Sequence, residues 1–357
     1  MKITIAVSGI NAVDNPGPGT GIIRSLKQSS LDVRTIGLAY DTMEPGIYMD
    51  DIVDKTYLMP YPSSDQDSFL KRLEYINSIE KIDIIISALD AELPVMIALK
   101  EDIENLGIKI LIPTKKMFAL RNKTELKKIA EAIQVKSPEY ISCTSLSDLF
   151  NAVEKVGFPC MIKGPFYEAF KVNSLVEAET KFHKISAKWG FPIIVQKFIY
   201  GEEYDVVGLG DGKGNDLGIF AIKKMTTTSL GKVWNAISIH NEKLAQATKR
   251  MVQYLKWQGG FEFEVLIENK TQELYLLEIN PRFPAWVYMA GACGINLPER
   301  MVKFLLFNED KFPSDYKSGK IMIRYTAEII KDIADFEKIT TLGELENNPK
   351  ITEFSNE

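Results

Sequence analysis

The stretch GGFEFEVLIENKTQELYLLEINPR, residues 259–282, decides the fold, because it predicts two strands joined by a polar turn. In the first strand, apolar side chains alternate with Glu262 and Glu264, which is the period of a strand with one buried face. The second strand shows a similar alternation, so each strand is expected to have an apolar and an acidic face. The predicted faces of the second strand are Tyr275, Leu277 and Ile279 on one side, and Leu276, Glu278, Asn280 and Arg282 on the other.

The register of this hairpin brings two carboxylates together. A turn centred on Thr271 places Glu264 directly opposite Glu278. Side chains that face each other in this way lie roughly 5 Å apart, and like charges there repel. A register shifted by one residue would place Glu264 among Leu277 and Ile279, which costs more free energy than the repulsion. The sequence therefore predicts a carboxylate pair on one face of the hairpin.

Two adjacent carboxylates need a cation or a shared proton between them. Glu264, Glu278 and the amide of Asn280 offer only oxygen ligands, with no His or Cys nearby. Such a set suits Mg²⁺ or Mn²⁺ better than Zn²⁺. Arg282 cannot ligate a cation, but its guanidinium can hold a phosphate that the cation bridges. The alternative is an edge hairpin with a solvated acidic face. We prefer the metal site because Pro281 ends the ladder at the charged tip.

Length and charge describe an ordinary globular chain. Its 357 residues are enough for two or three domains, and 25% charged with 45% hydrophobic residues is a usual composition. A net charge of −5 gives no reason to expect a nucleic-acid partner. No apolar run approaches the roughly 18 residues that span a bilayer. We see no signal peptide before the first strand, so no membrane partner is expected.

The thiols and imidazoles offer little for catalysis. Cys143, Cys160 and Cys293 are far apart in the chain and match no metal or redox spacing. A reducing cytoplasm is the simplest location for such a protein. The two histidines, His183 and His240, are expected to be surface residues rather than catalytic bases.

The first part of the chain predicts a doubly wound parallel sheet over residues 1–113, with strands at 3–9, 32–38, 82–89 and 108–113 and helices at 69–80 and 94–107. Gly17, Gly19 and Gly21 lie in the first strand-to-helix loop without the spacing of a dinucleotide fingerprint. This loop either receives an anion, such as a substrate carboxylate, or is only a tight turn. Asp90 and Glu92 follow an apolar strand, where either both bind a substrate amine or Asp90 caps the next helix.

The remaining chain alternates between short helices and strands. Helices are predicted within 115–133 and at 144–156, 174–188, 242–256 and 296–307. Besides the hairpin, strands are predicted at 157–164, 217–225, 233–239 and 320–329, with two more within 191–214. Arg324 falls in the last of these strands, and the sequence favours a surface role for it.

Two lysines, a polar hinge and the acidic hairpin follow one another in an order that resembles the ATP-grasp superfamily, most of all its carbamoyl-phosphate-synthase-like carboxylate–amine ligases. The resemblance covers residues 110–310 and implies a mixed α/β and α+β fold. An N-terminal pre-ATP-grasp α/β domain (1–113) would precede a two-lobed ATP-grasp domain (114–312), whose lid lobe spans about 135–200, and a C-terminal extension (313–357). The residues that carry the resemblance are Lys123, Lys163, Gln196, Lys197, Ile199, Glu203, Lys223, Glu264, Glu278, Asn280 and Arg282.

The resemblance also implies a role for each of these residues. Lys123 and Lys163 would neutralise the phosphates of ATP, a task that suits ammonium groups on long stems. The backbone of the hinge, with Gln196, Lys197 and Ile199, would read the adenine edge, and Glu203 would accept the ribose hydroxyls. Glu264, Glu278 and Asn280 would bind one or two Mg²⁺ ions, or Mn²⁺. Arg282 and Lys223 would stabilise the moving γ-phosphoryl group.

Two segments depart from the family pattern. Where many members have a glycine-rich loop over the phosphates, residues 164–172 read GPFYEAFKV, and bulky residues cannot bring several N–H groups onto a phosphate. Either Tyr167 and Lys171 replace those contacts, or this lid serves the acceptor substrate. The aromatic segment 283–294 offers Trp286 and Tyr288 either as pocket walls or as core residues.

The implied function is an ATP-dependent carboxylate–amine ligase, in which ATP activates a carboxylate as an acyl phosphate and an amine then forms an amide, releasing ADP and phosphate. The substrates would be a small carboxylate and an amine, possibly an amino acid or a peptide. The alternatives are an ATP-grasp enzyme that acts on a peptide or carrier-bound substrate, and a nucleotide-binding module without catalysis. Family analogy also suggests a homodimer.

Overall fold

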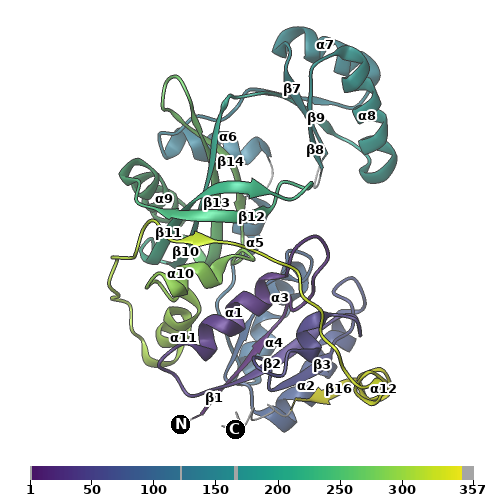
Figure 1. Ribbon diagram of the computed structural model, residues 1–357, viewed down its shortest axis with the longest axis vertical. Coiled ribbons are helices and arrows are strands. Elements are labelled where there is room, and N and C mark those ends of the chain that lie inside the picture. Colours follow the sequence, from purple (N-terminus) through teal and green to yellow (C-terminus); the bar gives the residue numbers. More distant parts are fainter. Residues whose placement is uncertain (1, 121–122, 165–167, 348–357) are drawn as a thin grey trace, which may run out of the picture.

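The computed structural model describes residues 2–120, 123–164 and 168–347, without the side chains of residues 123 and 124. Within these residues the strands form three sheets, two of six strands and one of four. Figure 1 shows the N-terminal sheet at the bottom, a central sheet above it, and a lobe with the four-stranded sheet at the top. The mixed α/β organisation that the sequence predicts is confirmed.

The N-terminal sheet is doubly wound. Five of its described strands run parallel in the order β3-β2-β1-β4-β5. The strands are apolar on both faces, so helices cover both: α1 packs on one face, and α2, α3 and α4 pack on the other. The bounds are β1 (Ile3–Val7), α1 (Pro18–Lys27), β2 (Val33–Ala39), the 3-10 helix η1 (Pro45–Tyr48), β3 (Lys55–Leu58), α2 (Gln66–Glu80), β4 (Ile84–Ile86), α3 (Leu93–Ala98), α4 (Lys100–Asn105) and β5 (Lys109–Ile110).

Some predicted bounds in this sheet are wrong. The strand expected at 82–89 pairs only over β4, because the chain leaves the ladder at the polar Ser87. The helix expected at 94–107 is broken at Leu99, whose ψ of 11° separates α3 from α4. The short strand β3 was not predicted.

The first glycine-rich loop is a tight turn against β1. A Cβ atom on Gly19 would lie 2.1 Å from the carbonyl oxygen of Ser8, so only glycine fits there. The N–H groups of Gly17 and Gly19 donate to the carbonyls of Asn11 and Gly9. These two N–H groups are therefore used within the loop, which favours the turn over the anion site.

The central sheet is antiparallel, in the order β14-β13-β10-β11-β12-β15. Helices α6 and α9 pack on one face through a core that includes Phe261, Phe263 and Val265. Helices α10 and α11 cover part of the other face. The bounds are α5 (Lys115–Ala119), α6 (Lys123–Ala132), β10 (Gly201–Asp211), β11 (Asp216–Thr227), β12 (Val233–Ile239), α9 (Glu242–Leu255), β13 (Gln258–Glu268), β14 (Leu274–Asn280), α10 (Val287–Ala292), α11 (Leu297–Phe307) and β15 (Ile321–Met322).

The upper lobe carries the four-stranded sheet, in the order β6-β9-β7-β8, with two helices packed on it. In Figure 1 this lobe stands away from the rest and joins the central sheet where β9 leads into β10. The predicted helices at 144–156 and 174–188 are confirmed, whereas β6 and β8 were not predicted. The bounds are β6 (Tyr140–Cys143), α7 (Leu146–Val156), β7 (Cys160–Lys163), β8 (Ala169–Val172), α8 (Leu175–Trp189) and β9 (Ile193–Lys197).

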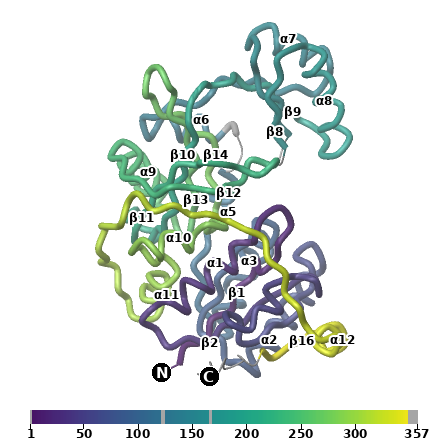
Figure 2. The backbone as a smooth tube through the Cα atoms, viewed as in Figure 1, coloured from purple at the N-terminus to yellow at the C-terminus, as the bar shows by residue number. Residues whose placement is uncertain are grey.

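The segment after residue 312 runs back across the molecule. It adds β15 to the edge of the central sheet, then passes α12 (Ile333–Leu342) and adds β16 (Glu344–Glu346) antiparallel to β3. Figure 2 shows this path as the yellow tube that crosses from the central part to the N-terminal part. In its described part, the predicted extension therefore contributes to both large sheets instead of forming a unit of its own. The other predicted domain boundaries stay predictions.

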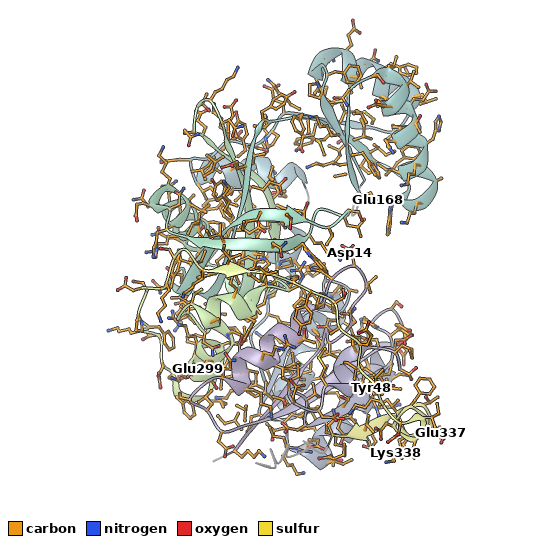
Figure 3. All side chains as sticks on the ribbon, viewed as in Figure 1. Asp14, Tyr48, Glu168, Glu299, Glu337 and Lys338 are labelled. Atoms are coloured by element: carbon orange, nitrogen blue, oxygen red, sulfur yellow. The ribbon has the colours of Figure 1, made fainter. Side chains whose placement is uncertain are left out.

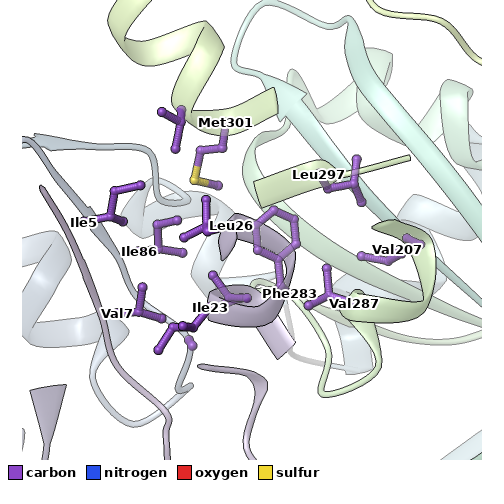
Figure 4. Close-up of a cluster of buried hydrophobic side chains, with 14 of the residues drawn as sticks. Ile5, Val7, Ile23, Leu26, Ile86, Val207, Phe283, Val287, Leu297 and Met301 are labelled. Atoms are coloured by element: carbon purple, nitrogen blue, oxygen red, sulfur yellow. The ribbon is translucent and has the colours of Figure 1, made fainter. Parts of the chain in front are cut away.

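One apolar cluster joins the N-terminal and central parts. Ile23 and Leu26 of α1 lie in the same buried cluster as Phe283 and Val287. Figure 4 shows these side chains between α1, α11 and the central sheet. Because this contact is apolar and buried, it fixes the carboxyl ends of the N-terminal strands against the end of the hairpin. Within the described residues, no helix has the length and apolar character needed to cross a membrane.

Candidate active site

The hairpin of β13 and β14 has the predicted register. Glu264 pairs with Glu278, and Glu262 pairs with Asn280. Directly paired residues of antiparallel strands project to the same face, so the two predicted carboxylates share a face. A bulge follows, because Val265 pairs with Leu276 and leaves Leu277 as the extra residue. Leu276 is therefore buried in the apolar core with Ile279, and its predicted place on the acidic face is wrong.

The acidic face contains one carboxylate more than the predicted metal set. Glu262 is 6% exposed and accepts hydrogen bonds from the indole N–H of Trp286 (2.7 Å) and from Asn280 Nδ2 (3.0 Å). The same Nδ2 donates to Glu264 at 2.8 Å. Burial and the neighbouring Glu264 raise the pKa of Glu262. Asn280 thus joins two carboxylates through its nitrogen and keeps its Oδ1 for another partner.

Lys224, and not Lys223, is the lysine of this cluster. Lys224 Nζ lies 2.9 Å from Glu264, 3.1 Å from Glu203 and 3.3 Å from Asp205. Lys223 projects to the opposite face of β11 and pairs with Glu202 at 2.6 Å. The predicted place of Lys223 beside the phosphates is therefore wrong, because side chains alternate along a strand and the sequence does not show which of two adjacent lysines faces inward.

Asp205 adds a buried carboxyl group beside Glu264. It pairs with Glu264 across β10 and β13 and is 1% exposed. Within the described residues its two carboxylate oxygens accept no hydrogen bond, although Lys224 is close. Burial raises its pKa well above the usual value, against the opposing effect of Lys224. Burial also tends to raise the pKa of Glu264. The charge and hydrogen bond of Lys224 outweigh this effect, so the pKa of Glu264 is lowered.

Arg282 connects the hairpin to the N-terminal sheet. Its Nε donates to Asp90 at 3.3 Å, and Nη1 lies 3.5 Å from Glu262. Burial alone would lower the pKa of Arg282, but Asp90 and Glu262 more than offset it, so the guanidinium keeps its charge. Asp90 therefore holds Arg282, and it does not cap α3, whose N-cap is Glu92.

Lys163 reaches the acidic face from the upper lobe. It is the last residue of β7, and Glu278, Glu203 and Glu264 act on its charge. Burial lowers the pKa of Lys163, while these carboxylates oppose the change. Four of the predicted residues, which come from two sheets, therefore act on one another electrostatically. The side chain of Lys123, the other predicted phosphate lysine, lies outside the described residues, although its backbone begins α6.

The predicted hinge lies where β9 leads into β10. Gln196 is 7% exposed at the end of β9, and Lys197 donates its N–H to the carbonyl of Glu139. A cavity of about 760 Å³ lies beside the hinge and includes Lys197 and Ile199 in its lining. It touches none of the acidic hairpin residues at 262, 264 and 278, so it is not the phosphate site.

In the glycine-poor segment 164–172, the described residues 169–172 form β8, which pairs antiparallel with β7. Tyr167, one of the two residues expected to replace the glycines, lies outside the described residues. Lys171, the other, places its ammonium 4.1 Å from the ring centre of Phe198 and 5.3 Å from that of Tyr200. It therefore lies against the hinge aromatics. Figure 3 shows Glu168, just before β8, above Asp14, which belongs to the first loop of the N-terminal part.

The aromatic segment after Arg282 is core. Trp286 is 2% exposed, and Val287 is fully buried. The hydroxyl of Tyr288 accepts a hydrogen bond from Gln28 at 2.6 Å. Trp286 is thus not a pocket wall but a buried donor that orients Glu262.

Glu92 is a structural residue and not a reader of amines. Its carboxylate is fully buried and accepts hydrogen bonds from Ser8, Ser87 and Tyr40, and from the N–H groups of Ala88 and Leu89. These contacts tie together the carboxyl ends of β1, β2 and β4. The substrate-amine hypothesis for Glu92 is therefore wrong, because this carboxylate is already saturated with donors.

Glu44 lies beside this cluster and makes stability depend on pH. Burial is the main reason that its pKa rises to about 7. The folded state therefore holds a proton that the unfolded state releases near pH 4.5, so this stabilisation is present below pH 4.5 and lost as pH rises through 7. We expect urea denaturation to show wild type losing about 2 kcal/mol more than Glu44→Gln between pH 5 and 8. Parallel pH profiles of the two proteins would contradict this.

Sequence reasoning missed Glu262, Asp205 and Lys224. Glu262 and Asp205 each carried a signal, since they alternate with Glu264 and Glu203 along their strands. No sequence signal distinguishes Lys224 from the adjacent Lys223.

The residues present fit a nucleotide with its divalent cation. Within the described part of the chain, no group of three or more His, Cys, Asp or Glu side chains is arranged to hold a metal ion. Mg²⁺ usually keeps several waters and needs only one or two carboxylates together with phosphate oxygens. Glu264, Glu278 and the oxygen of Asn280 supply such ligands, and the buried carboxyl group of Asp205 lies beside Glu264.

Comparison with known proteins agrees with this geometry. Residues 191–327 match the model of a family described as "ATP-grasp in the biosynthetic pathway with Ter operon". The carbamoyl phosphate synthase large chain of Pyrococcus furiosus is 24% identical over 243 residues, which are 63% of this chain. The chain spans only 22% of that relative's length.

Solved structures share the fold. The N5-carboxyaminoimidazole synthetase of Staphylococcus aureus superposes with a TM-score of 0.66 at 16% identity, covering 90% of this chain and 82% of that one. The L-amino acid ligase of Bacillus licheniformis gives a TM-score of 0.61 at 18% identity, covering 85% and 74%. The family model and the sequence relative thus show that residues 191–327 are similar to an ATP-grasp family, and the solved structures show that the fold is shared.

Proposed function

We propose that this protein is an ATP-dependent carboxylate–amine ligase that forms an amide bond and releases ADP and phosphate. The observation that carries the proposal is the pairing of Glu264 with Glu278 on the face that Lys163 approaches from the other lobe. Opposed carboxylates beneath a lysine are costly unless a cation and a polyphosphate come between them.

The chain's own residues supply positioning and charge. Glu264, Glu278 and Asn280 would hold Mg²⁺, which supplies Lewis-acid neutralisation of phosphate charge. Lys163 and Lys123 would neutralise phosphate oxygens, and the hinge with Gln196, Lys197 and Ile199 would hold the adenine. Glu203 would accept the ribose hydroxyls when it is released from Lys224. Arg282, fixed by Asp90, would stabilise the phosphoryl group during transfer.

The proposed reaction has two steps. A carboxylate oxygen of the first substrate attacks the γ-phosphorus, and the bond from that phosphorus to ADP breaks, which gives an acyl phosphate. The amine of the second substrate then attacks the acyl carbon, phosphate leaves, and the amine loses a proton to give the amide. The space between the lobes must exclude water during both steps, since an acyl phosphate hydrolyses.

The state of the cysteines favours a mechanism in which ATP activates the carboxylate over one in which a cysteine acts as a covalent nucleophile. All three thiols are free and buried, and burial raises the pKa of Cys143 and of Cys160 to about 11. Thiols of this kind stay protonated at neutral pH and are poor nucleophiles. Free buried thiols also support the proposed location in a reducing cytoplasm.

A small-molecule substrate pair is favoured over a peptide or carrier-bound substrate. An open groove along residues 283–294 would have supported the larger substrate, but Trp286 and Val287 are buried there. The shared fold with an L-amino acid ligase makes amino acids the first substrates to test. Retention of Glu264, Glu278 and Asn280 argues against a module without catalysis.

Binding calorimetry tests the metal site that this function needs. We expect ADP to bind at least tenfold more tightly in 5 mM Mg²⁺ than in EDTA, because Glu264, Glu278 and Asn280 would hold the cation and it would neutralise phosphate charge. A tenfold change corresponds to about 1.4 kcal/mol. Release of ADP from ATP is then measured with pooled amino acids and without them. Nucleotide binding that ignores Mg²⁺ would refute the metal site, and ADP release that no acceptor stimulates would argue against ligation of amino acids.

A further inference from the structure

The cavity of about 760 Å³ beside the hinge has walls from the upper lobe and from the central part, and we call it the hinge cavity. Val156 and Phe158 line it from the upper lobe. Lys127 of α6 and Tyr275 of β14 line it from the central part, and the hinge contributes residues 197–200. Its volume falls within the range of roughly 300–1,000 Å³ that is usual for small-molecule sites. The hinge cavity therefore has the size that a small ligand needs.

The hinge cavity is separate from the side chains proposed to hold ATP and Mg²⁺. Lys163, Glu203 and Glu278 do not line it. Among the described residues that are proposed to bind the nucleotide or the metal, it contains only Lys197 and Ile199 of the hinge. A ligand in this cavity would therefore touch the hinge without occupying the phosphate and metal site.

Aromatic rings form the apolar part of the cavity wall. Phe158 and Tyr200 are 41% and 59% exposed. Phe198 meets Tyr200 edge to face, with ring centres 4.9 Å apart, and the ring of Tyr275 is half-buried. Large exposed rings are stabilised when an apolar or aromatic group covers them. This wall favours a ligand that carries an aromatic ring.

The charged part of the wall is balanced in sign. The cavity is lined by three lysines and three glutamates, Lys127, Lys136, Lys197, Glu131, Glu139 and Glu268. Equal numbers of both charges favour neither a polyanion, such as a nucleotide triphosphate, nor a polycation. Lys136 already pairs with Glu273, and Glu268 accepts a hydrogen bond from Thr271.

The other four charged side chains of the wall are available to a ligand. Lys127, Lys197, Glu131 and Glu139 form no ion pair and no side-chain hydrogen bond with other described residues. Glu139 acts on the ring of Tyr275, where it adds to the effect of burial in raising the pKa. Free ammonium and carboxylate groups on one wall match a zwitterion, whose carboxylate pairs with a lysine and whose ammonium pairs with a glutamate.

The aromatic wall also connects the cavity to the proposed phosphate site. Phe198 and Tyr200 are the rings that the ammonium of Lys171 contacts. Lys171 lies on β8, and Ala169 of the same strand pairs with Lys163 at the end of β7. A ligand that fixes the two hinge rings therefore acts on the strand pair that carries Lys163. Coupling of this kind is reciprocal, so a nucleotide would change the affinity of the cavity by the same factor.

We propose that the hinge cavity binds a zwitterionic ligand with an aromatic ring, either an aromatic amino acid or a dipeptide that contains one, and that this ligand regulates nucleotide binding. The rings would cover the aromatic wall, and the two charged ends would pair with the free lysines and glutamates. The site lies outside the proposed active site, so it does not depend on which reaction this enzyme catalyses.

Binding is tested by calorimetric titration of the full chain with L-phenylalanine and with L-phenylalanyl-L-phenylalanine. We expect one of them to bind with a Kd of about 1 mM or lower. L-alanine and L-alanyl-L-alanine lack the rings, and 3-phenylpropionate lacks the ammonium, so each should bind at least tenfold more weakly. Tighter binding of phenylalanine points to a free amino acid, and tighter binding of the aromatic dipeptide points to a peptide.

Ser137→Trp places an indole in the cavity, since Ser137 lines it, and is expected to weaken binding at least tenfold. Ser78→Trp is the matched control, because Ser78 is exposed on α2 of the N-terminal part, and it should bind like wild type. The double variant Glu131→Gln with Glu139→Gln removes both free carboxylates and should also weaken binding at least tenfold. Urea denaturation shows that each variant is folded, and the double variant serves if Ser137→Trp is not.

Regulation is tested by titrating a non-hydrolysable ATP analogue with Mg²⁺ into the protein, with and without a saturating concentration of the ligand. We expect the Kd of the analogue to change at least threefold in wild type and in Ser78→Trp, and to stay unchanged in Ser137→Trp. The Kd of the ligand should change by the same factor when the analogue is saturating.

Three results would overturn the proposal. Wild type that binds neither aromatic probe has no such site, and binding that both cavity variants leave unchanged belongs elsewhere on the molecule. Ligand binding that saturating analogue abolishes would show that the two compete for one site. Equal affinity for the analogue with and without the ligand would refute the regulatory role. None of these measurements uses ADP release, so a failure of the ligase function would leave the hinge site standing.

Discussion

Replacement of Glu278 by glutamine is expected to lower the rate of ADP release at least 100-fold. Glu278 faces Glu264 across the hairpin and acts on the charge of Lys163 in the other lobe. The glutamine side chain has nearly the same shape but removes one of the two charges that would hold the cation. Loss of one preorganised charged group at a site of phosphoryl transfer typically costs about 10²–10³ in kcat. The measurement is the initial rate of ADP release with Mg-ATP and the pooled amino acids.

Glu273→Gln is the matched control on the same hairpin. Glu273 forms an ion pair with Lys136 beside the hairpin turn, away from the acidic face, so its variant should keep the wild-type rate. Both variants should also keep the wild-type urea midpoint, because neither residue is buried in the core. A Glu278→Gln protein that releases ADP as fast as Glu273→Gln would show that the pair does not serve catalysis.

Replacement of Lys224 by methionine is expected to destabilise the fold by about 3–5 kcal/mol, the usual cost of removing one partner from a buried charge cluster. The side chain of Lys224 is 5% exposed and lies within 3.3 Å of Glu203, Asp205 and Glu264. Without the ammonium, Asp205 and Glu264 lose the cation that lies within 3.3 Å of both carboxyl groups. The measurement is the free energy of unfolding from urea denaturation at pH 7.

Lys223→Met is the neighbouring control, because the two lysines differ by one position and by the face of β11 that they occupy. Lys223 pairs with Glu202 at a side-chain exposure of 35%, and such surface pairs contribute about 0–1 kcal/mol. We therefore expect Lys223→Met to stay within 1 kcal/mol of wild type. Low pH should reduce the difference in free energy of unfolding between the two variants. Protonated carboxyl groups carry no charge, so the ammonium of Lys224 no longer stabilises them. Equal stabilities of the two variants at pH 7 would contradict the placement of Lys224.

The sequence predicted most of what depends on period and spacing. Alternation along residues 259–282 gave the hairpin, and the position of Thr271 gave the pairing of Glu264 with Glu278. Both predictions are correct because side chains alternate with a fixed period along a strand, and because the centre of the turn sets which residues pair. The apolar runs of the first 113 residues likewise predicted parallel strands covered by helices on both faces.

Features that depend on local irregularity were not predictable in this way. The bulge at Leu277 moved Leu276 into the core, and no residue type in LYLLEIN marks where the extra residue falls. Lys223 and Lys224 are the same residue type in adjacent positions, and only the pairing with β10 decides which of them faces Glu264. The sequence does not predict the buried role of Glu92, because its partners Ser8 and Tyr40 come from distant strands.

By itself, then, the sequence determined the carboxylate pair, its register and the order of the elements, because these follow from the chain's local geometry. Only the tertiary structure decided which charges meet: Asp90 with Arg282, Lys163 with Glu278, and Lys224 with Asp205. It also left the Nε of Arg324 without a partner among the described residues. Contacts of this kind join segments far apart in the chain, and burial gives them a strength that exposed charges do not have.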